Sequence, residues 1–442
     1  MNKDWQHKQF RNIIDIKHGY PFKGEFFSAS GKYVLLTPGN FFEAGGFKRV
    51  TAKDKYYIGE FPEEYLHKKD DLIVAMTEQA EGLLGSCALV PEDNLYLHNQ
   101  RLGHITMNEN EVDKKFIYYL FQMKYIRKQI RLTSTGSKVK HTSPERIYDV
   151  ELFLPPFAEQ QKIASILSAL DKKIAINNKI NNELEAIAKT LYDYWFVQFD
   201  FPNANGKPYK SSGGKMVYSE ELKREIPERW ETDLISSKVQ INSGYPFSSK
   251  DYLLNGKFRI ITIKNVQDGE LLLNKVDYLD SMPEKLPEYC MLSIGDILIS
   301  LTGNVGRMAI VDDYNLLLNQ RVGKIVTHAN YLYYSYLFFL RDENRLRLEK
   351  IAGGSSQSNL SPLDAVDDYM AIPTEKILLK FNQRLNPIYK KMLSVKIENR
   401  KLTQLRDWLL PMLMNGQVSV ADAKEQIDEL MVAEPVQGYG ES

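Results

Sequence analysis

The feature that most constrains this 442-residue chain is an internal repeat. Segments that return 225 positions later are Trp5 (as Trp230), residues 19–22 (as 244–247), 31–37 (as 256–262) and 71–74 (as 296–299). Beyond a small deletion, residues 99–101 return as 319–321, and residues 143–144 return as 361–362. A near-constant offset broken by short deletions is what duplication of a folded unit leaves behind, so we expect two similar modules.

Composition narrows the class of protein but names no partner. The chain is 43% hydrophobic and 11% aromatic, as in ordinary globular proteins, and its 57 basic residues balance its 57 acidic residues. Any charged surface that binds a partner must therefore be a local patch. The N-terminus lacks the apolar core of a signal peptide and no apolar run is long enough to span a membrane, so we expect a cytoplasmic protein with buried, reduced Cys87 and Cys290.

Each repeat begins with short β-type runs and ends in a long helical pattern without glycine. Expected strands include 33–36, 72–75 and 297–300, and a helical patch is expected over 116–132. The predicted domains are 1–153 and 226–371 as globular modules, 154–199 and 372–416 as long helices, 200–225 as a linker and 417–442 as a tail.

A heptad of apolar residues runs along both long helices. A helix from 159 to 197 would extend about 58 Å at about 1.5 Å per residue, and two such helices, equivalent by the repeat, could pair antiparallel. The expected helix-pair interface comprises Ile163, Leu167, Leu170, Ile174, Asn181, Leu184, Leu191, Leu385, Ile388, Met392, Asn399, Leu402 and Leu409. Asn177, Asn181 and Asn399 lie near its middle. Either these polar side chains face solvent by coincidence or, as we favour, they form a buried polar layer that fixes the register of the two helices.

Several motifs together resemble the specificity subunits of type I restriction-modification systems. They are the run 154–163 (Leu-Pro-Pro-Phe-Ala-Glu-Gln-Gln-Lys-Ile) before a long helix, Trp195-Phe196, the linker 205–214, Ile226-Pro227 before Trp230, and the run 405–411 (Leu-Arg-Asp-Trp-Leu-Leu-Pro). The resemblance covers essentially the whole chain. It implies an α+β fold with two pseudo-symmetric target-recognition domains separated by a pair of long antiparallel helices.

The resemblance also implies a function. Each recognition domain would read one half of a bipartite, non-palindromic site in double-stranded DNA, and the helices would set the spacer and dock two methyltransferase subunits. Motor and nuclease subunits would join for cleavage. Because the modules differ in sequence, the half-sites should differ, with centres about 10 bp apart. Two alternatives stay open: a fused restriction-methylation enzyme, and a scaffold whose modules bind protein.

Catalytic motifs are missing from the sequence, so we expect a non-catalytic chain without a cofactor. Residues 154–157 look superficially like an adenine methyltransferase loop, but Leu154 cannot hydrogen-bond an amino group and the second copy keeps one proline, which favours a turn that leads into a helix. No Walker-type or dinucleotide fingerprint is present. His98 and His104 have no cysteine or carboxylate partner repeated in the other half, so a metal site is not expected.

Candidate DNA contacts come from comparing the two copies. Shared residues should be scaffold or phosphate contacts, which applies to Asn99-Gln100-Arg101 and Asn319-Gln320-Arg321, whereas divergent loop tips should read bases or be plain solvated loops. Residues 114–144 contain no acidic residue, which favours phosphate contact. The predicted DNA-binding residues are Lys23, Thr77, Glu78, Gln79, Arg101, Lys124, Arg127, Lys128, Arg131, Thr135, Ser137, Lys138 and Lys140 in the first copy, and Ser248, Thr302, Asn304, Arg307, Arg321, Ser355, Ser356, Gln357 and Asn359 in the second.

Overall fold

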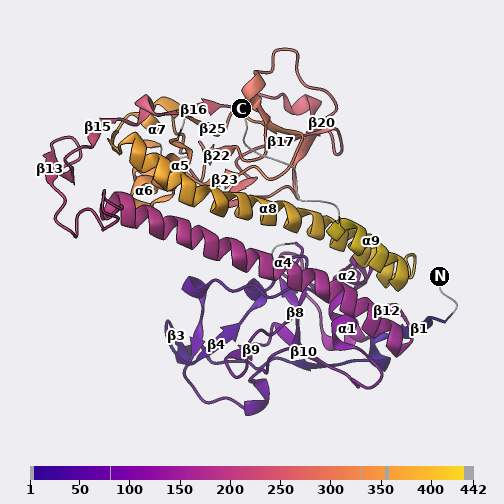
Figure 1. Ribbon diagram of the computed structural model, residues 1–442. Coiled ribbons are helices and arrows are strands. Elements are labelled where there is room, and N and C mark those ends of the chain that lie inside the picture. The colour runs from indigo at the N-terminus through magenta and orange to yellow at the C-terminus, as the bar shows by residue number, and fades with distance from the viewer. Residues whose placement is uncertain (1–3, 80, 329, 354–357, 433–442) are drawn as a thin grey trace. The chain divides into compact units, whose positions relative to one another are not determined.

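The computed structural model describes residues 4–79, 81–328, 330–353 and 358–432 (Figure 1). Two compact units emerge: one comprises the chain up to Ile174 together with the segment from Lys401 onward, and the other comprises Ala175–Arg400. Each unit contains one copy of the repeat and parts of both long helices, α4 (Phe157–Tyr192) and α8 (Glu375–Met414).

The first unit is a mixed module of short strands and three short helices. The strands are β1 (Gln6–Gln9), β2 (Asp15–His18), β3 (Phe27–Ser28), β4 (Tyr33–Leu36), β5 (Tyr56–Tyr57), β6 (Leu72–Ala75), β7 (Thr77–Glu78), β8 (Cys87–Leu89), β9 (Tyr96–His98), β10 (Leu102–Thr106), β11 (Lys140–His141) and β12 (Glu151–Leu154). The helices are α1 (Lys114–Leu120), α2 (Lys124–Leu132) and α3 (Pro144–Tyr148). The expected helical patch is therefore two helices, separated at Phe121–Met123.

The second unit repeats this plan. Its strands are β13 (Met216–Ser219), β14 (Arg224–Pro227), β15 (Glu231–Leu234), β16 (Val239–Ser243), β17 (Phe258–Ile261), β18 (Val266–Gln267), β19 (Glu270–Leu271), β20 (Asp277–Leu279), β21 (Met291–Leu292), β22 (Ile297–Ser300), β23 (Met308–Ile310), β24 (Leu316–Leu318), β25 (Val322–Thr327) and β26 (Tyr369–Ile372). Its helices are α5 (Leu332–Leu340), α6 (Asp342–Ile351) and α7 (Pro362–Val366).

Sheet topology confirms the duplication. In the first unit the strand orders are β2-β10-β6-β8 and β3-β5-β4-β9, and in the second they are β16-β25-β22-β23 and β20-β17-β24-β21. The parallel pair β4 and β9 recurs as β17 and β24, and the antiparallel pair β1 and β12 recurs as β15 and β26. The central strands β6 and β22 are buried along their full length, which is why β6 is apolar throughout and β22 is apolar up to Ser300.

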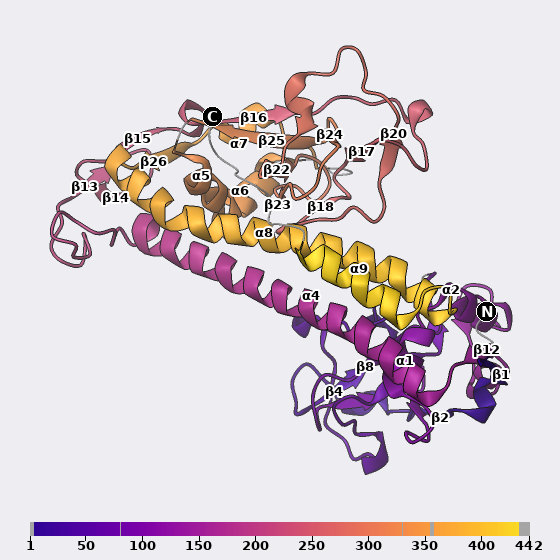
Figure 2. The same cartoon turned by 45° about the vertical axis from the view of Figure 1, so that its right-hand side comes forward.

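The seam of the long helices is buried or half-buried at every predicted position. In the first unit, Ile163, Leu167 and Leu170 of α4 share one core with Leu402 and Leu409 of α8. In the second unit, Ala188 and Tyr192 of α4 again share a core with Phe381 and Leu385 of α8, and Trp195 joins it from the π-helical turn, Asp193–Val197, that continues α4. Within that unit Asn177 faces Asn399 and Trp195 faces Phe381, so the helices run antiparallel there, as expected (Figure 2).

Asparagines form a partly buried polar layer near the middle of the seam: Asn177 and Asn181 are buried and Asn399 is half-buried. The amide of Asn177 donates to Asn399 Oδ1 at 2.8 Å and to Glu398 Oε2 at 2.9 Å, and the amide of Asn399 donates to Asn178 Oδ1 at 2.7 Å. Asn177 is only 1% exposed. Because a slipped pairing would leave these amides without partners in an apolar seam, the layer favours one register.

The segment expected to be a tail contains a helix, α9 (Val420–Val432). The backbone N–H of Asp422 donates to Ser419 Oγ at 3.2 Å, and the backbone N–H of Ser419 donates to Asp422 Oδ2 at 3.3 Å, which together cap its first turn. Ala423 is fully buried in the core of the first unit. The sequence signal that could have predicted α9 is short: a Ser-x-x-Asp cap followed by a weak apolar stripe.

The linker is also more ordered than expected. β13 and β14 form a hairpin, Tyr209 stacks on Phe201 with 4.8 Å between ring centroids, and Asp200 accepts hydrogen bonds from Ser211. Aromatic burial thus stabilises a segment whose Gly, Ser and Asn content is typical of a flexible connection.

Candidate nucleic-acid interface

Three separate segments meet beyond the end of β6 in the first unit. The backbone N–H of Met76 donates to Arg101 O at 2.9 Å, and that of Thr142 donates to Met76 O at 2.9 Å. β7, which contains Thr77 and Glu78, pairs with β11, and Thr135 bridges to His141. Predicted contact residues from all three segments are therefore brought together.

The second unit builds the same junction with different side chains. The backbone N–H of Leu301 donates to Arg321 O at 3.0 Å, and that of Leu360 donates to Leu301 O at 2.7 Å. Thr302 bridges to Asn359, as Thr77 lies beside the 135–141 segment in the first copy. The two junctions share backbone hydrogen bonds, which do not depend on side-chain identity.

The shared Gly-Tyr-Pro-Phe turns support these junctions. A Cβ on Gly19 would lie 1.9 Å from Asn99 O, and one on Gly244 would lie 2.2 Å from Leu318 O. The next turn is held by Asn99 Oδ1, which accepts from Arg101 N at 2.9 Å, and by Asn319 Oδ1, which accepts from Arg321 N at 3.2 Å. The asparagines therefore have a structural role. Arg101 and Arg321 are exposed, and neither guanidinium makes a hydrogen bond or ion pair with the described residues.

Glu78, Arg127 and Arg131 of the predicted contact set serve internal contacts. The Glu78 carboxylate is 3% exposed, accepts from the backbone N–H groups of Gly82, Leu83 and Leu84 at 2.9–3.0 Å, and pairs with Arg131 Nη1 at 2.5 Å. Arg127 donates to the carbonyls of Leu84, Glu43 and Gly82. Burial lowers the pKa of Arg127, offset in part by nearby acidic groups. These side chains hold residues 82–84 in place.

Most of the other first-copy candidates are open to solvent. Lys23, Gln79, Lys124, Lys128, Thr135, Ser137 and Lys138 are exposed and Lys140 is half-buried, whereas Thr77 is 6% exposed and has its hydroxyl 3.2 Å from His141 Nδ1. None of these lysines forms an ion pair with a described residue. They remain available to an anionic partner.

In the second copy, Ser248, Asn304 and Asn359 are exposed, and Thr302 is buried. Arg307 is half-buried and bonds to Gln267, with Asp268 3.9 Å away. Ser355, Ser356 and Gln357 lie outside the described residues.

A hollow of about 350 Å³ opens beside the first junction. Thr77, Gln79 and Arg101 line it together with Lys53, Lys55 and Asn40, which the sequence did not single out. The repeat could have identified Asn40 as a residue of this site, because Thr37 and Asn40 recur as Thr262 and Asn265. In each copy the asparagine Oδ1 accepts a hydrogen bond from the threonine N at 2.9 Å.

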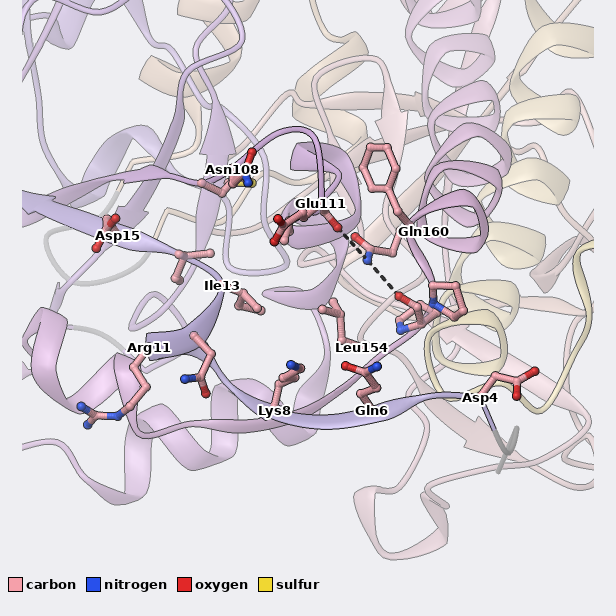
Figure 3. A pocket seen from close by; sticks show the side chains of 17 residues that line it. Asp4, Gln6, Lys8, Arg11, Ile13, Asp15, Asn108, Glu111, Leu154 and Gln160 are labelled. Carbon is pink, nitrogen blue, oxygen red and sulfur yellow. Dashed lines mark hydrogen bonds between the residues drawn. The ribbon is translucent and has the colours of Figure 1, made fainter.

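A second hollow, of about 450 Å³, lies where the first module leads into α4 (Figure 3). β12 ends at Leu154 and α4 begins at Phe157, so the Pro-Pro turn leads into a helix, as expected. Gln160, 1% exposed, holds the turn: its amide donates to Pro155 O at 2.9 Å and to Glu111 O at 3.4 Å (Figure 3). Its Oε1 also accepts from Asp113 N at 3.0 Å.

No helix in the described part of the chain is both long and apolar enough to cross a membrane.

Residues 2–186 and 227–365 match the family described as type I restriction modification DNA specificity domain. The chain is similar to the MjaIX specificity subunit of a type I restriction enzyme from Methanocaldococcus jannaschii, with 26% identity covering 73% of each chain. It is also similar to the HindI specificity subunit from Haemophilus influenzae, with 24% identity covering 73% of this chain and 81% of that protein.

Among solved structures, the S subunit of a type I restriction-modification system from M. genitalium has a similar fold, with a TM-score of 0.57 and 17% identity over 93% of this chain and 96% of that chain. The duplicated modules, the long helices and the family match agree with one another. This chain belongs to the family of type I restriction-modification specificity subunits, the non-catalytic DNA-recognition components of their complexes.

Proposed function

We propose that each copy of the repeat reads one half of a bipartite, non-palindromic DNA site, while α4 and α8 set the spacer and carry two methyltransferase subunits. The observation that supports this most directly is that the two junctions keep the same backbone hydrogen bonds but present different side chains. A shared scaffold with divergent tips suits two readers of two different sequences.

Within each junction we assign roles by exposure. Arg101 and Arg321, shared and unpaired, contact phosphates or the same base in both halves. Gln79, Thr135 and Ser137 in the first copy, and Asn304 and Asn359 in the second, read bases. The DNA phosphates are contacted by exposed or half-buried lysines, which displace the counterions that surround the duplex. These lysines are Lys23, Lys124, Lys128, Lys138 and Lys140.

A domain exchange tests modular readout. Residues 1–150 are replaced by the corresponding module of a relative with a different site, and the methylated positions are mapped by single-molecule sequencing. One half of the site should change and the other should stay. Change in both halves, or in neither, would refute the proposal.

A helix insertion tests the spacer. One extra heptad in α4 and the matching heptad in α8 should lengthen the non-specific spacer without altering the bases read, because the seam keeps its apolar period. An insertion in α4 alone is the matched control and should abolish methylation by mismatching the Asn177 and Asn399 layer.

Family membership makes the two alternatives weaker, and each has its own assay. A fused enzyme would bind S-adenosylmethionine without added subunits. A protein scaffold would show no affinity for random duplex DNA in filter binding. Sequence-selective DNA binding without S-adenosylmethionine binding supports the proposed function against both.

A further inference from the structure

Three histidines and an aspartate of the first copy come together at the opposite end of β6 from the junction. Asp71 directly precedes β6, His67 lies four residues earlier, His98 ends β9 and His104 lies on β10. Ligand-type atoms of His67, Asp71 and His104 lie within 4.8 Å of one another. The ring centroid of His67 is 4.6 Å from that of His98 and 4.9 Å from that of His104.

One buried nitrogen of this cluster lacks a hydrogen-bond partner among the described residues. Asp71 Oδ2 lies 3.0 Å from His67 Nδ1 and accepts from Lys68 N at 2.8 Å, and Asp71 Oδ1 lies 3.8 Å from His104 Nε2. His67 Nε2 is buried without a hydrogen-bond partner among the described residues. His98 is fully buried and His67 is 1% exposed. Buried nitrogens left unpaired cost free energy, so a missing partner is indicated.

The second copy shows what normally occupies this position. Asp296 stands where Asp71 stands, and its Oδ2 accepts from Ser293 N at 2.8 Å as Asp71 accepts from Lys68 N. His104 is replaced by Lys324, whose Nζ lies 2.7 Å from Asp296. The strand register proves the equivalence, since His104 lies opposite Ile73 and Lys324 lies opposite Leu298.

The other two histidines correspond to leucines. His67 and His98 align with Leu292 and Leu318, which offer no ligand atoms. The second copy therefore neutralises its aspartate with a fixed ammonium group and packs hydrocarbon around it. The first copy has exchanged three non-ligating side chains for three imidazoles around the same carboxylate.

We propose that His67, Asp71 and His104 bind a divalent transition-metal ion of the zinc class, which revises the expectation from sequence that the chain has no metal site. Two imidazoles and a carboxylate form a ligand set that suits Zn²⁺, and the donors belong to separate segments of the module. His104 and Asp71 have side chains 19% and 22% exposed, which provides a path for the ion. Bound metal would pin β10 to the segment before β6, with β9 packed against it through His98, where the second copy relies on an ion pair.

The test uses the untagged full-length chain, stripped with a chelator and titrated with Zn²⁺ by calorimetry. We expect one Zn²⁺ per chain and a rise in the melting temperature of about 3 °C at saturation. Co²⁺ should bind at the same site and give visible absorption bands that report nitrogen and oxygen ligation. Absence of Zn²⁺ uptake by the stripped chain would overturn the proposal.

A variant that copies the second repeat keeps the test independent of folding. His104→Lys should fold, because it recreates the Lys324 and Asp296 pair, yet lose Zn²⁺ affinity by more than about 100-fold, beyond the effect of losing an outer-shell partner. His18→Lys, the same change at an exposed position of the neighbouring strand β2, is the matched control and should bind Zn²⁺ normally. Equal Zn²⁺ binding by His104→Lys and the parent chain would place the metal elsewhere and refute the site.

Discussion

The two copies of the repeat are alike in backbone and unlike in the groups that hold them together. In the first copy a polar network joins α1, α4 and α8: the Tyr119 hydroxyl donates to Asp171 at 2.7 Å, and Arg406 pairs with Asp171 at 3.1 Å. At the positions equivalent to Asp171 and Arg406, the second copy has Tyr389 and Ala188, and Tyr389 stacks on Tyr333 with 4.4 Å between ring centroids.

Loop anchoring differs in the same way. The first copy holds the loop after β7 with the Glu78 carboxylate, whereas the equivalent residue of the second copy is Gly303. There, Ser300 bonds to Asn304 O and accepts from Arg307 N at 3.0 Å. Backbone hydrogen bonds thus define the common fold, and side-chain anchors are exchangeable, which leaves the tips free to diverge.

The largest expected effect is a loss of stability that is equal in the two copies. Gly19→Ala and Gly244→Ala each place a methyl group within 2.2 Å of a backbone carbonyl, so each should lower the free energy of unfolding by about 3 kcal/mol. Chemical denaturation measures this loss in the free energy of unfolding. Gly24→Ala is the control, since nothing lies within 4 Å of its added Cβ. A loss no greater than that of Gly24→Ala would contradict the shared close approach.

The next effect belongs to the first copy alone. Glu78→Ala strips three backbone N–H groups and Arg131 of their acceptor and should cost about 2–3 kcal/mol of local stability. Hydrogen exchange of residues 82–84 should rise while exchange of 303–306 stays unchanged. Glu81→Ala, an exposed partner of the same arginine, should have little effect. Unchanged protection of 82–84 would show that Glu78 is not the anchor.

A smaller effect concerns the polar network. Burial and the Asp171 carboxylate hold the pKa of Tyr119 well above its ordinary value, so its hydroxyl donates throughout the physiological range. Arg406→Leu should lower the free energy of unfolding by about 1–2 kcal/mol, and adding Asp171→Leu should recover part of that loss, because the second copy manages with apolar groups. Strict additivity in the double-mutant cycle would argue against a coupled pair.

The smallest effect concerns DNA electrostatics and separates the copies. Lys124 and Lys128 are exposed and form no ion pair with any residue that the structure describes, whereas the equivalent helix of the second copy has Arg345 bonded to Glu349 at 3.2 Å and to Asp268 at 3.4 Å. Lys124→Gln with Lys128→Gln should reduce the salt slope of DNA binding by about 2, while Arg345→Gln should leave it nearly unchanged. Equal changes would remove the proposed asymmetry of backbone contact.

Much of the fold could be predicted because it depends on local pattern. The buried strand 72–75 is a continuous apolar run, the strand 297–300 is apolar up to Ser300, and a heptad pattern predicted the seam of α4 and α8. The helix over 420–432 and the order of the linker were missed, since a short cap and a few aromatic contacts are weak signals in polar sequence.

The candidate site was only partly accessible to sequence reasoning. The meeting of 77–79 with 135–141 follows from neither periodicity nor spacing, yet the divergence of both tips between copies identified them. Divergence between the copies placed Glu78 in the contact set and positive charge placed Arg127 and Arg131 there, whereas in the structure they contact loop carbonyls, N–H groups and one another.

The sequence by itself determined the duplication, the two long helices and the absence of recognisable catalytic motifs, because repeat offset and heptad period are one-dimensional properties. Only the tertiary structure decided that His67, Asp71, His98 and His104, spread over 38 positions, share one site. The reason is physical: antiparallel pairing of β10 with β6 and the packing of β9 carry these side chains across chain separations that no local pattern records.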